Sequence, residues 1–224
     1  MESPLLIVGA GGFARETAAA VAEIDGLELL GFLDDDPALH GHQVDGVPVL
    51  GPIDAVADHR DARVVVCVGS PQRYHTRRLL VERLALDAER YATVIHPAAS
   101  VGRGTTIAPG TVLLAGVVTT TAVEIGAHVA VMPQVVLTHD DVIGDYVTFG
   151  SGVRLGGSAR IEGGAYLGAG ALVREGRTIG AGSLLGMGSV LLEDMPSGEI
   201  WAGVPAQRLR AAPDPVLAAL AGAQ

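Results

Sequence analysis

The chain has 224 residues, of which 49% are hydrophobic, and its mean hydropathy of +0.39 is high for a protein in water. Gly, Pro or charged residues interrupt each apolar stretch before it reaches the roughly 18 residues of a membrane span, so we expect the apolar excess to be buried in the fold and no membrane partner. The formal net charge of −10 also argues against nucleic acid or an anionic membrane surface as a partner.

Two features of the composition indicate where the protein works. The N-terminal apolar run lacks a basic segment before it and leads directly into glycines, which favours a first strand over a secretory signal. Cys67 is the single cysteine, so no disulfide can form within the chain. We therefore expect a cytoplasmic protein in which Cys67 is a buried strand thiol.

Residues 1–90 alternate predicted strands with predicted helices. The expected strands are 4–9, 27–33, 47–50 and 62–69, and the expected helices are 15–24, 53–59 and 71–86. This alternation is typical of a small parallel sheet of Rossmann type.

A glycine-rich loop joins the first predicted strand to the first helix. Gly9, Gly11 and Gly12 let backbone N–H groups and a helix N-terminus approach a phosphate, with Phe13 next to them. A segment of about 90 residues provides only one mononucleotide half of a dinucleotide fold. The loop therefore favours a nucleotide-sugar or phosphate site over a redox cofactor site.

Further polar positions fall at the same edge of the predicted sheet. Asp34 and Asp35 follow the second strand and Gly69 follows the fourth, and ligands of such sheets bind at the carboxyl ends of strands. The two carboxylates could accept hydrogen bonds from a ribose or a base. Alternatively, they cap the turn before Pro37.

A six-residue repeat occupies the second part of the chain. Every sixth residue from Ile95 to Leu191 is aliphatic or Phe, with Thr119 as the exception. The fifth position of the hexad is small in 14 of 17 cases, and its exceptions are Asp141, Arg177 and Met195. A period of six predicts short strands separated by corners, with the first position pointing inward and small residues filling the corners.

This register resembles that of the hexapeptide-repeat acyltransferases, and the match runs without insertion from residue 95 to residue 196. The resemblance implies a left-handed parallel β-helix of about 18 residues per coil, five to six coils, and a homotrimer. It divides the chain into a Rossmann-like nucleotide-sugar domain at 1–90, an acetyltransferase β-helix at 91–200 and a C-terminal tail at 201–224.

The order of the two domains narrows the resemblance. The segments GAGGFA, GFLDDDP, GVPVLG, HPAASVG, THDDVIGD and WAGVPAQRL together resemble the NeuD/PglD-type sugar acetyltransferases, which include sialic-acid O-acetyltransferases and nucleotide-sugar N-acetyltransferases. In that family the N-terminal domain binds the nucleotide-sugar, and acetyl-CoA lies along the β-helix between neighbouring subunits. The resemblance implies that His139 is the general base and Asp140 its carboxylate partner.

The expected chemistry requires these residue types. An amine or hydroxyl attacks a thioester well only if a base of near-neutral pKa removes its proton, and a carboxylate fixes the tautomer of an imidazole and stabilises its cation. Gly157 lies 18 residues after His139 and should stack one coil above it, where its N–H is a candidate oxyanion donor. The resemblance places acetyl-CoA along the same surface. The residues expected to contact acetyl-CoA are Thr148, Gly157, Ala169 and Met187, and those expected to contact the nucleotide-sugar are Gly11, Gly12, Phe13, Asp34, Asp35 and Gly69.

Four positions depart from the family pattern. Phe13 stands where members often carry His and Ala14 where they often carry Gly, Thr148 replaces a second His that touches the acetyl group in some members, and Met132 replaces an Asn near the acceptor amine. These departures leave the base intact and leave the identity of the acceptor sugar open.

Other functions remain as alternatives. The same base would serve O-acetylation of a sugar hydroxyl, and a non-catalytic nucleotide-sugar-binding scaffold could retain the fold. A metal enzyme of the γ-carbonic anhydrase type would need three converging histidines, whereas His128 and His139 are not a whole number of coils apart. We therefore expect no metal, and we expect His128 to face solvent.

Asp141 is the least explained residue of the repeat, since a bare carboxylate at an inward position is costly to bury. Arg177 lies two coils further along the same face. Either Arg177 reaches across Ala159 to pair with Asp141, or both corners bulge outward and both charges are solvated.

Overall fold

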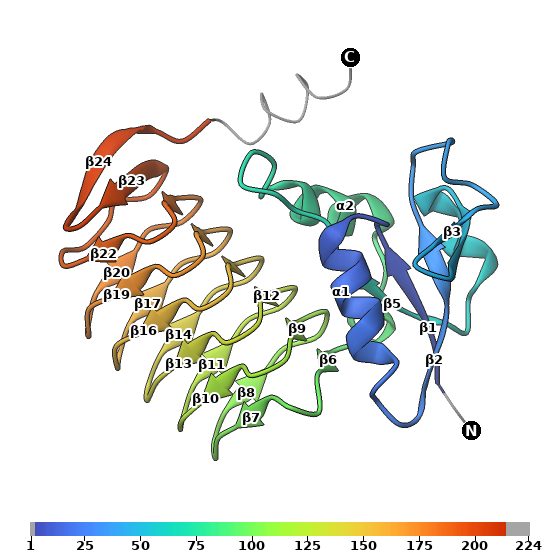
Figure 1. Ribbon diagram of the computed structural model, residues 1–224, viewed down its shortest axis with the longest axis horizontal. Coiled ribbons are helices and arrows are strands. Elements are labelled where there is room, and N and C mark those ends of the chain that lie inside the picture. Colours follow the sequence, from blue (N-terminus) through green and yellow to red (C-terminus); the bar gives the residue numbers. More distant parts are fainter. Residues whose placement is uncertain (1–2, 214–224) are drawn as a thin grey trace.

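The computed structural model describes residues 3–213, and its N-terminal part is a five-stranded sheet with helices on both sides (Figure 1). Strands β1, β2, β4 and β5 are parallel, and β3 adds an antiparallel edge, in the order β3-β4-β2-β1-β5. The elements are β1 (Ser3–Val8), α1 (Gly12–Val21), β2 (Leu27–Leu33), β3 (Gln43–Val44), β4 (Val47–Gly51), the 3₁₀ helix η1 (Ile53–Asp58), β5 (Arg63–Val66), α2 (Thr76–Leu84) and the 3₁₀ helix η2 (Ala88–Arg90).

The apolar strands of this sheet are buried on both faces. In β1, Leu5 and Ile7 pack on the α1 side, whereas Leu6 and Val8 pack on the opposite side with η1 and α2. Successive side chains of a strand point to opposite faces, so a continuous apolar run is what a two-sided core requires. The predicted Rossmann-like sheet is confirmed, although the short strand β3 was not predicted and the segment 53–58 is 3₁₀ rather than α-helical.

The second part of the chain is a left-handed parallel β-helix with three flat faces (Figure 1). Hydrogen-bonded partners are 18 residues apart throughout the repeat, as between β10, β13 and β16. Face I consists of β6 (Val94–Ile95), β9 (Val112–Leu113), β12 (Ala130–Val131), β15 (Thr148–Phe149), β18 (Tyr166–Leu167) and β21 (Leu184–Leu185). Face II consists of β7 (Ser100–Val101), β10 (Val118–Thr119), β13 (Val136–Leu137), β16 (Arg154–Leu155), β19 (Leu172–Val173) and β22 (Val190–Leu191). Face III consists of β8 (Thr106–Ile107), β11 (Glu124–Ile125), β14 (Val142–Ile143), β17 (Arg160–Ile161) and β20 (Thr178–Ile179).

The hexad register explains the interior of the β-helix. First-position residues such as Leu137, Phe149 and Ile161 are buried in one continuous core. Thr119, the exception, is also buried, and its hydroxyl oxygen accepts a hydrogen bond from the Gly102 N–H at 2.9 Å. The polar group is therefore satisfied where it interrupts the apolar column.

The N-terminal sheet is held against face I. Side chains of α1 share a buried cluster with residues of β6 and β9, including Val94, Val112 and Leu114. Arg77 of α2 donates hydrogen bonds to the corner that leads into β15. Faces II and III of the β-helix therefore have no cover from the N-terminal part among the described residues (Figure 1).

A hairpin extends face I at the far end of the β-helix. Strand β23 (Glu199–Gly203) pairs with β21, and β24 (Ala206–Ala211) pairs antiparallel with β23. The expected C-terminal tail, 201–224, is therefore largely β-strand over its described residues 201–213. Residues 214–224 lie outside the described residues.

Candidate active site at the His139 corner

His139 lies on the turn 138–141, which joins β13 of face II to β14 of face III and is called the His139 corner below. The side chains of His139 and Asp140 are 60% and 63% exposed, and Nδ1 of the imidazole lies 2.9 Å from Oδ2 of Asp140. With the proton on Nδ1, the imidazole donates to the carboxylate, and Nε2, on the edge of the ring that lies against Gly157, is an acceptor. The predicted pair is thus formed, and Nε2 is available to remove a proton.

The backbone of the corner is fixed by the coils on either side. The N–H of Asp140 donates to the Thr121 carbonyl in the coil below at 3.3 Å, and the N–H of Ser158 in the coil above donates to the His139 carbonyl at 2.8 Å. Asp140 has φ +62°, a left-handed conformation that the fourth position of many hexads adopts. Asp tolerates this conformation better than most residues.

Gly157 lies directly above His139, as the spacing of 18 predicts. A side chain on Gly157 would collide with the imidazole ring, so glycine makes room for the base. The Gly157 N–H has no acceptor among the described residues, which leaves it available as an oxyanion donor.

Asp141 is fully buried, and it is not paired with Arg177. Its Oδ2 accepts from the Thr138 N–H at 2.7 Å and its Oδ1 accepts from the Ala159 N–H at 2.8 Å, whereas Arg177 pairs with Asp194 at 3.6 Å. Both alternatives stated for the two charges are therefore wrong for Asp141, because backbone amides supply the partners that a buried carboxylate needs. Burial raises the pKa of Asp141 to about 6, opposed by these two hydrogen bonds.

The other residues predicted to contact acetyl-CoA lie elsewhere on the same chain. Ala169 and Met187 are exposed and stand one coil apart on the corner between faces I and II, which corrects the expectation of one shared surface with His139. The reason is arithmetic: Ala169 is two hexads after Gly157, so it falls on a different corner of the three-sided coil. Thr148 lies on face I, where its hydroxyl accepts a hydrogen bond from Arg77 at 2.7 Å.

The glycine-rich loop leads into α1 as predicted. Gly11 and Gly12 are exposed, α1 begins at Gly12, and no side chain caps its N-terminus. The first N–H groups of a helix have no intrahelical acceptor, so they remain available to an anion. Phe13 is half-buried and packs against the same cluster as Met132, which gives this loop an apolar neighbour on the β-helix.

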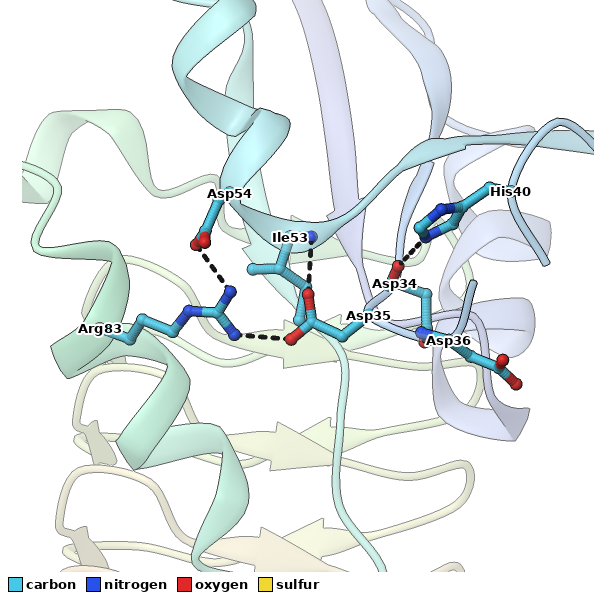
Figure 2. Close-up of polar contacts among 7 residues, drawn as sticks. All are labelled: Asp34, Asp35, Asp36, His40, Ile53, Asp54 and Arg83. Carbon is cyan, nitrogen blue, oxygen red and sulfur yellow. Dashed lines mark hydrogen bonds and ion pairs between the residues drawn. The ribbon is translucent and has the colours of Figure 1, made fainter. Parts of the chain in front are cut away.

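The carboxylates of Asp34 and Asp35 already have partners within the chain, and Figure 2 shows those of Asp35. Asp34 accepts from the N–H groups of Ala10 at 2.8 Å and of Asp36 at 2.9 Å, which ties the glycine-rich loop to the end of β2. Asp35 accepts from the Ile53 N–H at 3.0 Å and pairs with Arg83 at 2.6 Å.

Arg83 joins three elements, because its second terminal nitrogen lies 2.7 Å from Asp54 of η1 (Figure 2). The two aspartates raise the pKa of Arg83, chiefly by hydrogen bonding. Burial raises the pKa of Asp35, but the hydrogen bonds from Arg83 and from the Ile53 N–H, together with the charge of Arg83, outweigh burial, so that this pKa is lowered overall. Contacts of Asp34 and Asp35 with a substrate stay predictions, and the turn-capping role stated as their alternative is present in the structure.

Arg77, which was not predicted from the sequence as a functional residue, is the only fully buried arginine among the described residues. Its Nη2 donates to the carbonyls of Tyr146 at 3.0 Å and Val147 at 3.2 Å and to the Thr148 hydroxyl. Burial lowers the pKa of Arg77 to about 10. The exposed Gly69, at the carboxyl end of β5, lies next to this guanidinium.

His128 is buried, contrary to the expectation that it faces solvent. Its ring stacks on Tyr146 with centroids 5.3 Å apart and meets Tyr91 edge-on at 4.5 Å. The N-terminal part covers this corner, which the hexad register of the β-helix could not reveal. Burial and the nearby Arg77 lower the pKa of His128 to about 4, so the ring is neutral at neutral pH.

A group of metal-ion ligands and a membrane-spanning helix are both absent from the described residues. Within residues 3–213, no group of three His, Cys, Asp or Glu side chains is arranged to hold a metal ion. None of the helices in this range is long and apolar enough to span a bilayer.

Comparisons with known proteins agree with the geometry. Residues 4–84 match the model of the PglD N-terminal domain. A perosamine N-acetyltransferase variant from Caulobacter crescentus, solved with CoA and GDP-perosamine, shares 26% identity over 92% of this chain and 96% of its own, with a TM-score of 0.83. Residues 4–84 carry the PglD N-terminal domain, and over 92–93% of its length the chain is similar to solved sugar acetyltransferases.

Two other solved structures are similar to this chain. The acetyltransferase domain of PglB from Neisseria gonorrhoeae FA1090, in complex with acetyl coenzyme A, is 29% identical, covers 93% of this chain and all of its own, and has a TM-score of 0.83. WeeI from Acinetobacter baumannii AYE is 27% identical, with coverage of 92% and 99% and a TM-score of 0.78. No curated protein matches the sequence significantly. These similarities support the predicted family, and the predicted fold class is confirmed.

Proposed function

We propose that the protein transfers an acetyl group from acetyl-CoA to an amino group on a nucleotide-activated amino sugar in the cytoplasm. The observation that carries this proposal is the exposed His139–Asp140 pair, whose Nδ1 and Oδ2 atoms are 2.9 Å apart with Nε2 free. The similar structures that contain CoA with GDP-perosamine, or acetyl coenzyme A, favour this pair of substrates.

In the proposed reaction His139 is the general base. Nε2 removes a proton from the acceptor nitrogen as it attacks the thioester carbonyl, and Asp140 stabilises the imidazolium that forms. The Gly157 N–H donates to the developing oxyanion, and the imidazolium returns the proton to the departing CoA thiolate. A base of this kind contributes roughly 10²–10⁴-fold in rate.

The two predicted acetyl-CoA surfaces suggest that the site is shared between chains. Gly157 lies beside the base on one corner, whereas Ala169 and Met187 lie on another, so one extended ligand that contacts both groups is best accommodated between two chains. Met187, with 78% of its surface exposed, is an apolar side chain that such a ligand or a neighbouring chain would cover.

The outer surface of face II supports a homotrimer. Its outward positions are mostly apolar and only partly buried in the single chain. An uncovered apolar face of this kind favours contact with another copy of the chain. The apolar outward residues are Val118, Val136, Leu172 and Val190, and the polar ones are Ser100 and Arg154.

The proposal is tested by incubating purified protein with acetyl-CoA and a panel of UDP-, GDP- and dTDP-linked amino sugars, with release of free thiol as the measurement. We expect thiol release that depends on the amino sugar and falls roughly 10²–10⁴-fold in His139→Ala. His42→Ala, which changes an exposed histidine of the N-terminal part, serves as the matched control and should keep full activity.

The same assay separates the alternatives. Matched sugars with a hydroxyl in place of the amine would support O-acetylation if they alone release thiol. A protein that binds nucleotide-sugars but releases no thiol with any acceptor would be a scaffold, and the enzymatic proposal would then be wrong.

A further inference from the structure

Asp141 is a buried carboxylate at a position of the repeat that otherwise holds a small residue. Its side chain has no exposed surface, and no cation pairs with it among the described residues. A buried carboxylate without a cation is unfavourable unless hydrogen bonds compensate for lost hydration. The residue therefore needs an explanation that packing of the coil does not give.

The hydrogen bonds of Asp141 lie within and directly above the His139 corner. Oδ2 accepts from Thr138, the residue before His139, and Oδ1 accepts from Ala159 in the coil above. Within residues 3–213, the Thr138 and Ala159 N–H groups have no other acceptor. One carboxylate thus joins the start of the corner to the coil that carries Gly157.

We propose that Asp141 is a positioning residue, whose carboxylate fixes the backbone of the His139 corner and so sets the direction of the imidazole against Gly157. This inference rests on the proposed function, in which His139 is the base. Further contacts act on the same turn: the Thr138 hydroxyl donates to the Leu155 carbonyl at 3.1 Å, and the His139 carbonyl is held by Ser158. Asp141 supplies the part of this support that only an acceptor side chain can give.

The test compares Asp141→Asn with a matched control. An Asn amide keeps one acceptor oxygen, but its NH₂ group would face an N–H donor, so one of the two bonds is lost. Asp145→Asn is the control, because Asp145 also accepts a backbone N–H from an adjacent coil, that of Ala127 at 2.7 Å, on a corner without a candidate base. Both variants change one carboxylate into an amide.

Amide hydrogen exchange measures the backbone directly. In Asp141→Asn, exchange at Thr138 or Ala159 should accelerate by at least about tenfold, whereas in Asp145→Asn the change should be confined to Ala127. Unchanged exchange at both Thr138 and Ala159 would overturn the proposal.

Kinetic measurements then test whether Asp141→Asn lowers kcat by displacing His139. Misplacement of a catalytic group by about 1 Å costs on the order of 100-fold, so we expect kcat of Asp141→Asn to fall about 10- to 100-fold with KM for acetyl-CoA within about twofold. The same change in a His139→Ala background should cost nothing further, since the base it positions is absent. An equal loss in both backgrounds, or full kcat in Asp141→Asn, contradicts the positioning role.

A crystal structure of Asp141→Asn separates this inference from the proposed function. The imidazole should be displaced from Gly157 while the coils keep their register. If the parent protein shows no acetyl transfer, the proposed function fails, and the exchange and the crystal structure still decide whether Asp141 positions His139. An imidazole that stays in place in the variant rejects the inference whatever the activity.

Discussion

Asp140 is the proposed carboxylate partner of His139, and its backbone has a conformation that favours glycine. Substitution with glycine can therefore remove the carboxylate and leave the turn intact. Because φ is +62°, Asp140→Gly removes the carboxylate without straining the turn. We expect kcat to fall about 10- to 100-fold because the imidazole loses its partner. The free energy of unfolding should stay within about 1 kcal/mol of the parent, since relief of strain and added chain entropy offset each other.

Ala122 provides the control for this substitution. It has φ +53° on the same corner one coil below, without a carboxylate. Ala122→Gly should therefore leave activity unchanged in the thiol-release assay. Equal activity of Asp140→Gly and the parent would show that the carboxylate does not assist His139.

The pKa of Asp141 makes a prediction about stability. The folded-state pKa of about 6 exceeds the ordinary value of 3.8, so between these pH values the folded state holds more protons than the unfolded state. The contribution of Asp141 to the free energy of unfolding therefore falls as pH rises through this window, by on the order of 3 kcal/mol in total. Asp141→Asn removes this fall, and urea unfolding of both proteins from about pH 4 to about pH 7 measures it. A difference between the two proteins that is independent of pH would contradict the shifted pKa.

Residue-scale prediction from the sequence succeeded where the hexad register applies. The register placed His139 and Asp140 outward and Gly157 above them, because each position repeats every 18 residues. It could not supply the partners of Asp141, because these are backbone N–H groups and carry no signal in the sequence.

At the scale of elements, helix α2 is attached to the β-helix through one buried arginine. Arg77→Ala removes three hydrogen bonds to buried or half-buried oxygens and leaves a cavity. We expect the free energy of unfolding to fall by on the order of 3 kcal/mol, measured by urea denaturation. Arg78→Ala, at the next residue, removes an exposed pair with Glu82 and should cost less than about 1 kcal/mol. Similar losses in both variants would show that Arg77 does not carry the attachment.

Some helices and strands were predicted from the sequence more accurately than others. The apolar runs of β1 and β5 and the repeat of the β-helix were found because they depend on short periods within the chain. Helix α2 begins at Thr76 rather than near residue 71, and His128 is buried rather than solvated. Both differences arise at the contact between the two parts, where packing across the chain overrides local pattern.

At the scale of the whole molecule, face II has no cover from residues 3–213, so the proposed assembly can be tested there. Val136→Asp combined with Leu172→Asp introduces two charges on the outward side of this face, and we expect the proposed trimer to dissociate into monomers because charges are costly in an apolar interface. Light scattering after size-exclusion chromatography measures the mass. Thr178→Asp on the outward side of face III is the control and should keep the parent's assembly. A parent protein that is monomeric at micromolar concentration would contradict the trimer.

The sequence alone determined the two-part architecture, the coil of 18 residues and the pair His139–Asp140, because each depends on periodicity or on neighbours along the chain. Only the tertiary structure decided that Asp141 binds backbone amides, that Arg77 holds the N-terminal part against face I, and that Ala169 and Met187 lie on a different corner from the base. These depend on which segments meet in space, and hydrogen bonds to the backbone can be made by almost any residue that faces the partner.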